Sequence, residues 1–295
     1  MSETQVQAPQ RQAPAPAERS GAAPPVTIIA PPSRWPRPDV PELWRFRELM
    51  AVFVWRDLKV RYKQTHIGIG WALLQPILPT VVFTLVLGKF ANAPSDRLQY
   101  PIFAFAGLLL LQYFSSALSV SSGSLVANVG LITKVYFPRL LLPLAAVTTP
   151  LVDLTLGVGM LVVAMAIFHT WPSVAVLAAP LFVVMAFVTA FGVGLVFAAL
   201  NVRYRDIPYV IPIFIQLLPY ASGVVFAVSA LAPTYQWILA LNPITSAVWG
   251  WRWAMLDGPP PVWGQVALSA AVALLLLVGG LAFFKRAEPK FADTI

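Results

Sequence analysis

Residues 174–200 read VAVLAAPLFVVMAFVTAFGVGLVFAAL, without a charged side chain. A helix needs about 20 apolar residues to cross the roughly 30 Å hydrocarbon core of a bilayer, so this stretch is long enough to span it. The whole chain of 295 residues is 58% hydrophobic and 11% charged, whereas a soluble domain carries about 25% charged residues. The sequence therefore predicts an all-α polytopic membrane protein in contact with membrane lipids.

Five further apolar segments lie on either side of this stretch. Counted from the N-terminus, the six predicted spans are residues 68–90, 101–122, 140–168, 174–200, 207–228 and 265–284. Pro76 and Pro79 predict a kink in the first span, because proline removes a helix hydrogen bond. The sequence thus predicts six transmembrane helices in one transmembrane domain, residues 65–295.

The segment between the last two spans, residues 229–263, has a different character. Its apolar pieces are interrupted by proline and asparagine, and none is long enough to cross a bilayer. Such pieces are typical of a re-entrant or interfacial hairpin that rests against a helix bundle. We therefore expect an external re-entrant hairpin before the last helix, and its candidate functional residues are Asn242, Pro243 and Arg252.

The residues before the first span fall into two parts. Residues 1–41 are rich in Pro, Ala and Gln and predict a disordered cytoplasmic tail, since they bury too little apolar surface to fold. In residues 42–64, basic residues occupy one side of a predicted helix, and apolar residues recur on the other: Phe46, Leu49, Met50, Phe53 and Val54. This pattern predicts an amphipathic helix in the membrane interface; an ordinary soluble surface helix is the alternative.

The distribution of basic residues predicts the orientation of the chain. The net charge is +8, and Lys and Arg gather at the ends of apolar stretches rather than along one face. This distribution is typical of membrane topology and does not favour nucleic-acid binding. When the N- and C-termini are placed in the cytoplasm, only Lys89, Arg97 and Arg252 fall outside, so the positive-inside rule favours this orientation.

Several kinds of chemistry are excluded by what the sequence lacks. It has no cysteine, hence no disulfide, thiol nucleophile or Cys-ligated metal, and no GxxxxGK[ST] motif to hold nucleotide phosphates. His66 and His169 lie apart in the predicted topology, so no metal site is expected. The first forty residues show no cleavable signal peptide, and the first span is expected to act as its own insertion signal.

Asp153 is the only ionisable side chain expected deep inside the membrane. Two interpretations stay open: a pore-lining or gating carboxylate, or a packing carboxylate whose hydrogen-bond partners are Thr148, Thr149 or Thr155. A single acidic residue gives little support for proton coupling, which usually uses several buried ionisable groups.

Four segments together carry a resemblance to a known family. They are RDLKVRYKQTHIGIGWALLQPILPTVVFTLVLG (residues 56–88), LITKVYFPRLLLP (131–143), LNVRYRDIPYVIP (200–212) and LNPITSAVWGWR (241–252). In this order they resemble ABC type-2 polysaccharide and polyol phosphate export permeases, which export O-antigen, capsule or teichoic-acid chains. The resemblance covers residues 43–284.

This resemblance implies a transport permease rather than an enzyme. The chain would be the membrane subunit of an ATP-driven exporter of lipid-linked polysaccharide, most specifically O-antigen, in the bacterial inner membrane. It would form a homodimer, with ATP and Mg on a separate cytoplasmic P-loop ATPase and no cofactor on this chain. The alternative is an ABC type-2 teichoic-acid, drug or lipid exporter. A membrane glycosyltransferase and an ion-coupled carrier are less favoured, because the chain shows neither a large loop with paired acids nor an inverted repeat.

The resemblance places ATPase coupling in two predicted cytoplasmic connections. The sequence of the first connection predicts a short rigid helix that ends at Pro138. The coupling residues expected there are Leu131, Lys134, Phe137, Pro138 and Arg139. The second contributes Arg203, Arg205 and Asp206, where an arginine either pairs with Asp206 or contacts the ATPase. A basic loop without a partner is the alternative for both connections.

The resemblance also places a substrate path along the first spans. Its cytoplasmic entrance or gate is expected at Lys63, His66, Gly68, Trp71 and Gln75, for which a plain membrane-interface anchor is the alternative. The channel candidates are Phe83, Phe90, Tyr113, Ser119 and Asp153. Aromatic rings stack on sugar faces but also form the interfacial belt of many membrane proteins, and serines either line a polar path or make close helix contacts.

Overall fold

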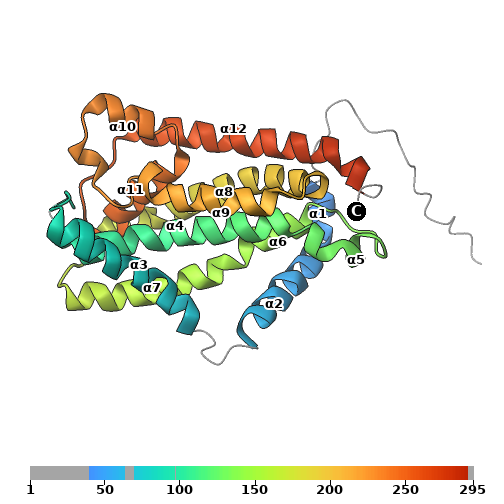
Figure 1. The fold of residues 1–295 in the computed structure, drawn as a ribbon, viewed down its shortest axis with the longest axis horizontal. Coiled ribbons are helices and arrows are strands. Elements are labelled where there is room, and N and C mark those ends of the chain that lie inside the picture. Colours follow the sequence, from blue (N-terminus) through green and yellow to red (C-terminus); the bar gives the residue numbers. More distant parts are fainter. Residues whose placement is uncertain (1–39, 64–69, 97, 292–295) are drawn as a thin grey trace, which may run out of the picture. The chain divides into compact units, whose positions relative to one another are not determined.

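The computed structural model describes residues 40–63, 70–96 and 98–291, all of which belong to one structural unit, residues 35–295. Regular structure within these ranges is helical, as predicted (Figure 1). The α-helices are α1 (Val40–Arg45), α2 (Arg47–Lys63), α3 (Gly70–Phe83), α4 (Tyr100–Gly123), α5 (Val129–Ile132), α6 (Leu141–Thr148), α7 (Pro150–Ile167), α8 (Ala179–Arg203), α9 (Ile207–Ala221), α10 (Pro233–Leu239), α11 (Pro243–Leu256) and α12 (Trp263–Ala287). Residues 1–39 of the predicted N-terminal tail, His66, Gly68 and Arg97 lie outside the described residues, whereas the last two residues of that predicted tail begin α1.

Helices α4 and α8 form the centre of the bundle. Helices α8, α11, α3, α6 and α7 pack around α4, while α12 and α11 cover α8. The most apolar window of α4 is 83% buried, against 22–33% for those of the other three long apolar segments. Helix α4 is therefore the element against which the others are placed, and the outer helices keep large apolar faces exposed.

The contact between α8 and α12 depends on two glycines. A Cβ atom added to Gly280 would lie 2.2 Å from the carbonyl oxygen of Gly192, and one added to Gly192 would lie 2.6 Å from the backbone of Leu277. Close approach of two backbones needs residues without a side chain, as is common where membrane helices cross. The two glycines therefore set how closely α12 lies on α8.

Within the described residues, four segments are long and apolar enough to cross a membrane: Tyr100–Gly123, Leu141–Ile167, Val174–Arg203 and Trp263–Ala287. They correspond to the second, third, fourth and sixth predicted spans. The third is divided at Thr149 into α6 and α7, because Pro150 has no N–H to continue the hydrogen-bond ladder. The first and fifth predicted spans form shorter apolar helices, Leu74–Phe90 and Ile207–Ala221.

The prediction of a fifth span reaching residue 228 is wrong at its C-terminal end. Helix α9 has 15 residues and ends at Ala221. Gly223 then adopts a left-handed conformation with φ of 64°, which glycine tolerates and which commonly ends a helix. The chain runs on without regular helix to the short 3₁₀ turn η4 (Val228–Ala230).

The first predicted span is continuous but not α-helical throughout. Helix α3 contains Pro76 and Pro79 and is followed by a π-helical segment, η1 (Thr84–Phe90). The wider turn appears in the bond from the Ala91 N–H to the Val86 carbonyl, five residues back. Such segments are rare and concentrate at functional sites.

The predicted hairpin consists of two short helices, α10 and α11, at the end of the bundle opposite α5 (Figure 1). Every residue of α11 except Trp253 is buried, against α4, α8 and α12. Asn242 caps α11, because its side-chain oxygen accepts a hydrogen bond from the Ile244 N–H at 3.2 Å. Pro243 occupies the first helical position, where a missing N–H is tolerated.

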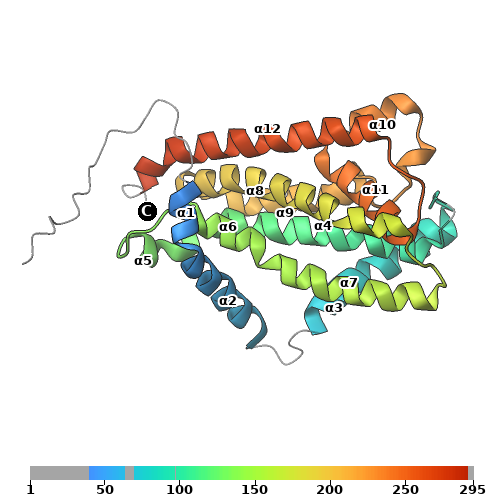
Figure 2. The ribbon, with the colours of Figure 1, turned by 180° about the vertical axis from the view of Figure 1, so that it is seen from behind.

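The predicted amphipathic helix appears as α1 and α2, with α2 beside α6 (Figure 2). The apolar face predicted from the sequence is real: Phe53 is buried, and Phe46, Leu49, Met50 and Val54 pack around it in one cluster with α6, α8 and Phe137. Trp55 and Val60 stay exposed. The predicted face therefore contacts the bundle itself.

Candidate functional site

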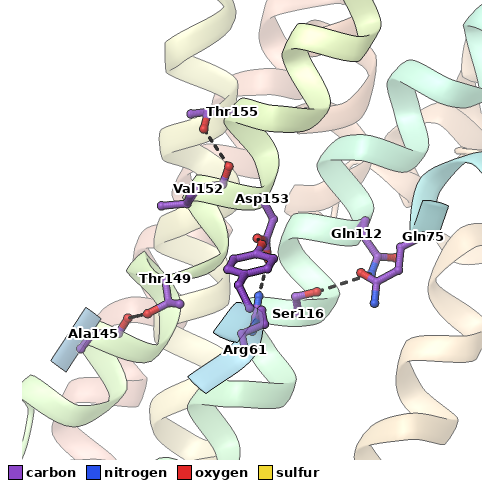
Figure 3. A network of polar contacts seen from close by, with 10 residues as sticks. Arg61, Gln75, Gln112, Ser116, Ala145, Thr149, Val152, Asp153 and Thr155 are labelled. Atoms are coloured by element: carbon purple, nitrogen blue, oxygen red, sulfur yellow. Dashed lines mark hydrogen bonds and ion pairs between the residues drawn. The ribbon is translucent and has the colours of Figure 1, made fainter. Parts of the chain in front are cut away.

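The centre of the site is an ion pair between α2 and α7. Arg61 on the last turn of α2 donates to one carboxylate oxygen of Asp153 (Figure 3). The hydroxyl of Tyr62 donates to the other carboxylate oxygen. Both charged side chains are partly exposed, at 30% for Arg61 and 21% for Asp153. Burial, and then the bond to Asp153, raise the pKa of Tyr62 to about 12, so this hydroxyl stays a neutral donor at physiological pH.

The alternative prediction that threonines satisfy Asp153 is wrong. Thr148 and Thr149 donate to the carbonyls of Leu144 and Ala145, one helical turn back, and Thr155 donates to that of Val152. Threonine hydroxyls in helices commonly make such local bonds. The partners of Asp153 instead lie more than ninety residues earlier in the chain, on another helix.

A groove of about 390 Å³ opens beside this ion pair. We call it the polar groove; its lining residues are Arg61, Tyr62, Gln75, Gln112, Ser115, Ser116, Ser119, Val120, Asp153 and Ile215. The Gln112 amide donates to the side chains of Gln75 at 3.3 Å and Ser116 at 3.5 Å (Figure 3). The groove thus offers amide and hydroxyl groups, with its two charges neutralising each other.

A second cleft, of about 600 Å³, lies under α2 and shares Arg61, Ser119 and Val120 with the polar groove. Its walls are mixed, with Phe53, Val60 and Leu142 among the apolar residues. Arg56 fastens α2 on this side through a bond of 2.8 Å to the side-chain oxygen of Asn128. Helix α2 therefore covers a cleft that continues into the polar groove. Two contacts hold the helix over this cleft, that of Arg56 with Asn128 and that of Arg61 with Asp153.

The structure brings together some of the predicted entrance and channel residues. Gln75, Ser119 and Asp153 line the polar groove. Tyr113 is buried in the core, with its hydroxyl 3.4 Å from the Val147 carbonyl.

Two predicted channel residues lie elsewhere along the first predicted span. Phe83 packs edge-to-face on Tyr220, and Phe90 is 84% exposed. Lys63 is exposed at the end of α2, and Trp71 lies in the first turn of α3.

The predicted coupling segment is helical for less of its length than expected. Helix α5 ends at Ile132, and turns and extended chain follow as far as Pro138. Leu131 is partly buried, whereas Lys134 and Tyr136 are exposed. The helix therefore stops well before the proline that was expected to end it.

Both ends of this connector contact other helices. The Phe137 ring packs 5.7 Å from that of Phe53 on α2. Arg139 donates to the carbonyl of Glu288, just beyond α12. The connector thus joins α2 to the end of α12.

The second predicted connection is exposed. Arg203, Arg205 and Asp206 are all exposed, and Arg203 stacks on Tyr204 at 5.3 Å. The ion pairs within the described ranges are Arg56–Asp57, Arg61–Asp153 and Lys285–Glu288, so neither arginine pairs with Asp206 there.

Arg252, which the sequence places on the external side, is buried within the protein. Its side chain is 4% exposed, and its guanidinium donates to the carbonyls of Phe103, Gly223 and Val224. The guanidinium also lies 3.6 Å from the centre of the Phe103 ring. Burial is possible because the broken end of α9 leaves carbonyls that a guanidinium satisfies.

Sequence reasoning missed Arg61, Tyr62, Gln112 and Ser116 as site residues. Gln112 had a visible signal, since it interrupts an apolar run directly after Leu108–Leu111. A lone amide in such a run favours contact with a cavity or another helix. Among the described residues, no cluster of three His, Asp or Glu side chains is suited to hold a metal.

Long apolar helices with a polar groove between them are typical of a multi-pass membrane protein. The comparison with protein families agrees: residues 48–256 match the ABC-2 type transporter family. The chain belongs to this family.

Individual relatives match over nearly their whole length. The chain is 28% identical over 262 residues to an O-antigen export system permease of Myxococcus xanthus, covering 87% of this chain and 98% of the relative. It is 26% identical to the O-antigen export system permease of Klebsiella pneumoniae, over 84% of this chain and 95% of the relative. It is 24% identical to the polysialic acid transport protein of Escherichia coli, over 81% and 92% respectively.

Proposed function

We propose that the chain is the membrane-spanning permease subunit of an ATP-driven exporter that moves lipid-linked polysaccharide, most specifically O-antigen, across the inner membrane. The observation that carries this proposal is the polar groove, where amides and hydroxyls line a space between otherwise apolar helices. Such groups bind sugar hydroxyls by neutral hydrogen bonds, which allow a polymer to slide. The relatives are O-antigen export permeases and a polysialic acid transport protein, which point to the same substrate class.

The proposed topology has six spans: α3 with η1, α4, α6 with α7, α8, α9 and α12. Both chain termini and the connector 131–139 lie in the cytoplasm, because the basic residues Lys134, Arg139, Arg205 and Arg286 gather there. Helix α2 lies at the cytoplasmic interface, and α10 with α11 form a re-entrant hairpin from outside. Residues 1–41 are a cytoplasmic tail.

The substrate enters beside α2. The cleft under α2 has the mixed walls that suit a lipid-linked sugar, and it leads to the groove past Arg61. The ion pair of Arg61 with Asp153 holds the end of α2 against α7, and so acts as a latch on this entrance.

A separate P-loop ATPase, which holds ATP and Mg, drives the cycle by pushing the connector. Phe137 transmits the displacement to α2 through Phe53, and Arg139 transmits it to the end of α12. Lys134, Arg205 and Asp206 are exposed and available to the ATPase. Movement of α2 then releases Asp153.

Two copies of the chain complete the path. Gln75 and Ser119 are exposed in the single chain, so one wall of the groove is open. The adjoining faces of α3 and α9 carry exposed apolar residues, including Leu78, Ile213 and Leu217. A second copy against these faces would enclose a route wider than one bundle provides.

Deletion of the gene in its own host tests this function. We expect surface polysaccharide to disappear and lipid-linked polymer to accumulate in the cytoplasm, as measured by immunoblotting of surface and membrane fractions. Complementation with Gln112→Leu should restore less export than the wild type, because the groove loses an amide. The matched control is Gln99→Leu, an exposed glutamine before α4 and outside the groove, which should export normally.

Unchanged surface polysaccharide in the deletion strain would refute the proposal. Sensitivity to a drug without loss of polymer would instead indicate the alternative exporter class. Co-purification of the ATPase with wild-type chain, reduced by Lys134→Glu, tests the docking site separately.

A further inference from the structure

A pocket of about 680 Å³ lies at the C-terminal ends of α8 and α12, away from the polar groove. Its lining residues are Ala199, Leu200, Val202, Arg203, Tyr204, Phe283, Arg286, Ala287 and Phe291. Ligand pockets usually measure between about 300 and 1,000 Å³ and combine apolar walls with a few polar groups. This pocket has that size and that mixture.

The charged residues among those lining the pocket are two arginines. Arg203 and Arg286 take part in none of the three ion pairs found within the described ranges. The neighbouring Lys285 is neutralised by Glu288 at 2.9 Å. Basic residues at helix C-termini are common because they complement the helix dipole, but here two arginines from different helices line one cavity. Among the residues that the structure describes, no acidic side chain pairs with either arginine of the pocket.

An exposed apolar stripe leads from this pocket along α12. Leu275, Gly279, Phe283 and Arg286 are all exposed and, at spacings of four, four and three, lie on one face of the helix. The rise from Leu275 to Arg286 is about 16 Å at 1.5 Å per residue, close to half of the roughly 30 Å hydrocarbon core. The stripe thus has the length of one leaflet, with the arginine at its polar end.

We propose that this pocket binds an anionic phospholipid of the inner membrane, with the lipid phosphate at Arg203 and Arg286 and an acyl chain along Leu275–Phe283. Guanidinium groups pair with phosphate oxygens in bidentate geometry, and basic pockets between membrane helices bind anionic headgroups. The leaflet assignment rests on the proposed topology, in which the pocket faces the cytoplasmic leaflet. The occupant is a membrane lipid rather than the ATPase, because the pocket continues into the apolar stripe of α12, which is as long as one leaflet of the bilayer is thick.

Native mass spectrometry of the purified full chain tests the proposal. Protein in detergent is titrated with phosphatidylglycerol, and with phosphatidylcholine as the zwitterionic comparison. We expect preferential binding of phosphatidylglycerol by the wild type. Arg203→Gln and Arg286→Gln should each weaken it about fivefold and the double variant about 25-fold, since a basic side chain near an anionic surface contributes ~1 kcal/mol, a factor of about five.

The matched control is Arg205→Gln, an exposed arginine two residues from Arg203 that does not line the pocket. It should bind phosphatidylglycerol as the wild type does. Equal binding by the double variant and the wild type would overturn the proposal, as would equal loss in Arg205→Gln. Unchanged lipid binding together with loss of ATPase co-purification would assign the pocket to the ATPase and refute it. Because lipid binding is measured without polymer, its failure is distinguishable from failure of the proposed export function.

Discussion

Removal of the Asp153 carboxylate should release α2 from α7. Asp153→Ala takes away the acceptor of both Arg61 and Tyr62, while Asp153→Asn keeps one oxygen for Tyr62 but removes the charge. The two variants therefore separate the contribution of the ion pair from that of the neutral hydrogen bond.

The expected magnitude follows from the exposure of the pair. A hydrogen bond to a charged group contributes ~1.5–3 kcal/mol and a neutral one ~1 kcal/mol. Because Arg61 is 30% and Asp153 21% exposed, we take the lower end, ~1.5 kcal/mol for the ion pair. Asp153→Asn should then raise the ratio of released to latched α2 about tenfold, and Asp153→Ala, losing ~2.5 kcal/mol, about 70-fold.

Distance measurement between spin labels reports this equilibrium. The chain has no cysteine, so Lys59→Cys on α2 and Val163→Cys on α7 provide the two labels without background, and dilution with unlabelled chain in nanodiscs isolates distances within one copy. The longer-distance population should grow from wild type to Asp153→Asn to Asp153→Ala. Adding Arg61→Met to Asp153→Asn should change little further, because the two residues act as one pair.

The matched control is Asp57→Asn, which removes a carboxylate of α2 whose partner, Arg56, lies on the same helix. Its distance distribution should equal that of the wild type. The reasoning fails if Asp153→Ala leaves the distribution unchanged, or if Asp57→Asn broadens it as much.

Three further predictions concern stability and coupling. Gly280→Ala should lower the free energy of unfolding by about 1–3 kcal/mol, and with it the thermal unfolding temperature in detergent, because the added Cβ would lie 2.2 Å from an α8 carbonyl oxygen. The control is the adjacent Gly279→Ala, whose Cβ would have nothing within 4 Å and which should unfold at no lower temperature than the wild type. Arg252→Met should remove three hydrogen bonds to backbone carbonyls and lower the free energy of unfolding by at least about 3 kcal/mol. Arg252→Lys should be intermediate in the same unfolding assay, and equal stability of wild type and both variants would contradict the proposed anchoring. Phe137→Ala should raise hydrogen exchange of residues 47–63, and unchanged protection there would show that the ring contact does not hold α2.

The long apolar segments were predictable because a simple length requirement governs them. Helices α4, α8 and α12 correspond to predicted spans, since about 20 apolar residues suffice to indicate a crossing. The apolar face around Phe53 was also visible from its helical spacing. The early end of α9 was harder, because Gly223 follows an apolar run that continues beyond it.

The sequence could not predict which site residues pair with each other, because the pairs are formed by tertiary contacts. Asp153 was singled out from the sequence, but its partner Arg61 lies on a helix that no local spacing relates to it. The nearby threonines were plausible hydrogen-bond partners of Asp153 by sequence distance, but their hydroxyls donate to backbone carbonyls of their own helical segments. The burial of Arg252 was not predicted, because a count of basic residues contains no information on which backbone carbonyls a broken helix leaves open.

The anchoring of Arg252 has a consequence for biogenesis. Its three acceptors, the carbonyls of Phe103, Gly223 and Val224, all belong to residues that the ribosome makes earlier. An arginine released alone into the bilayer centre costs about 2.5–3.5 kcal/mol on translocon insertion scales. Helix α11 should therefore reach its final position only after α4 and the end of α9 have packed together. Its insertion then depends on correct assembly of the helices made before it.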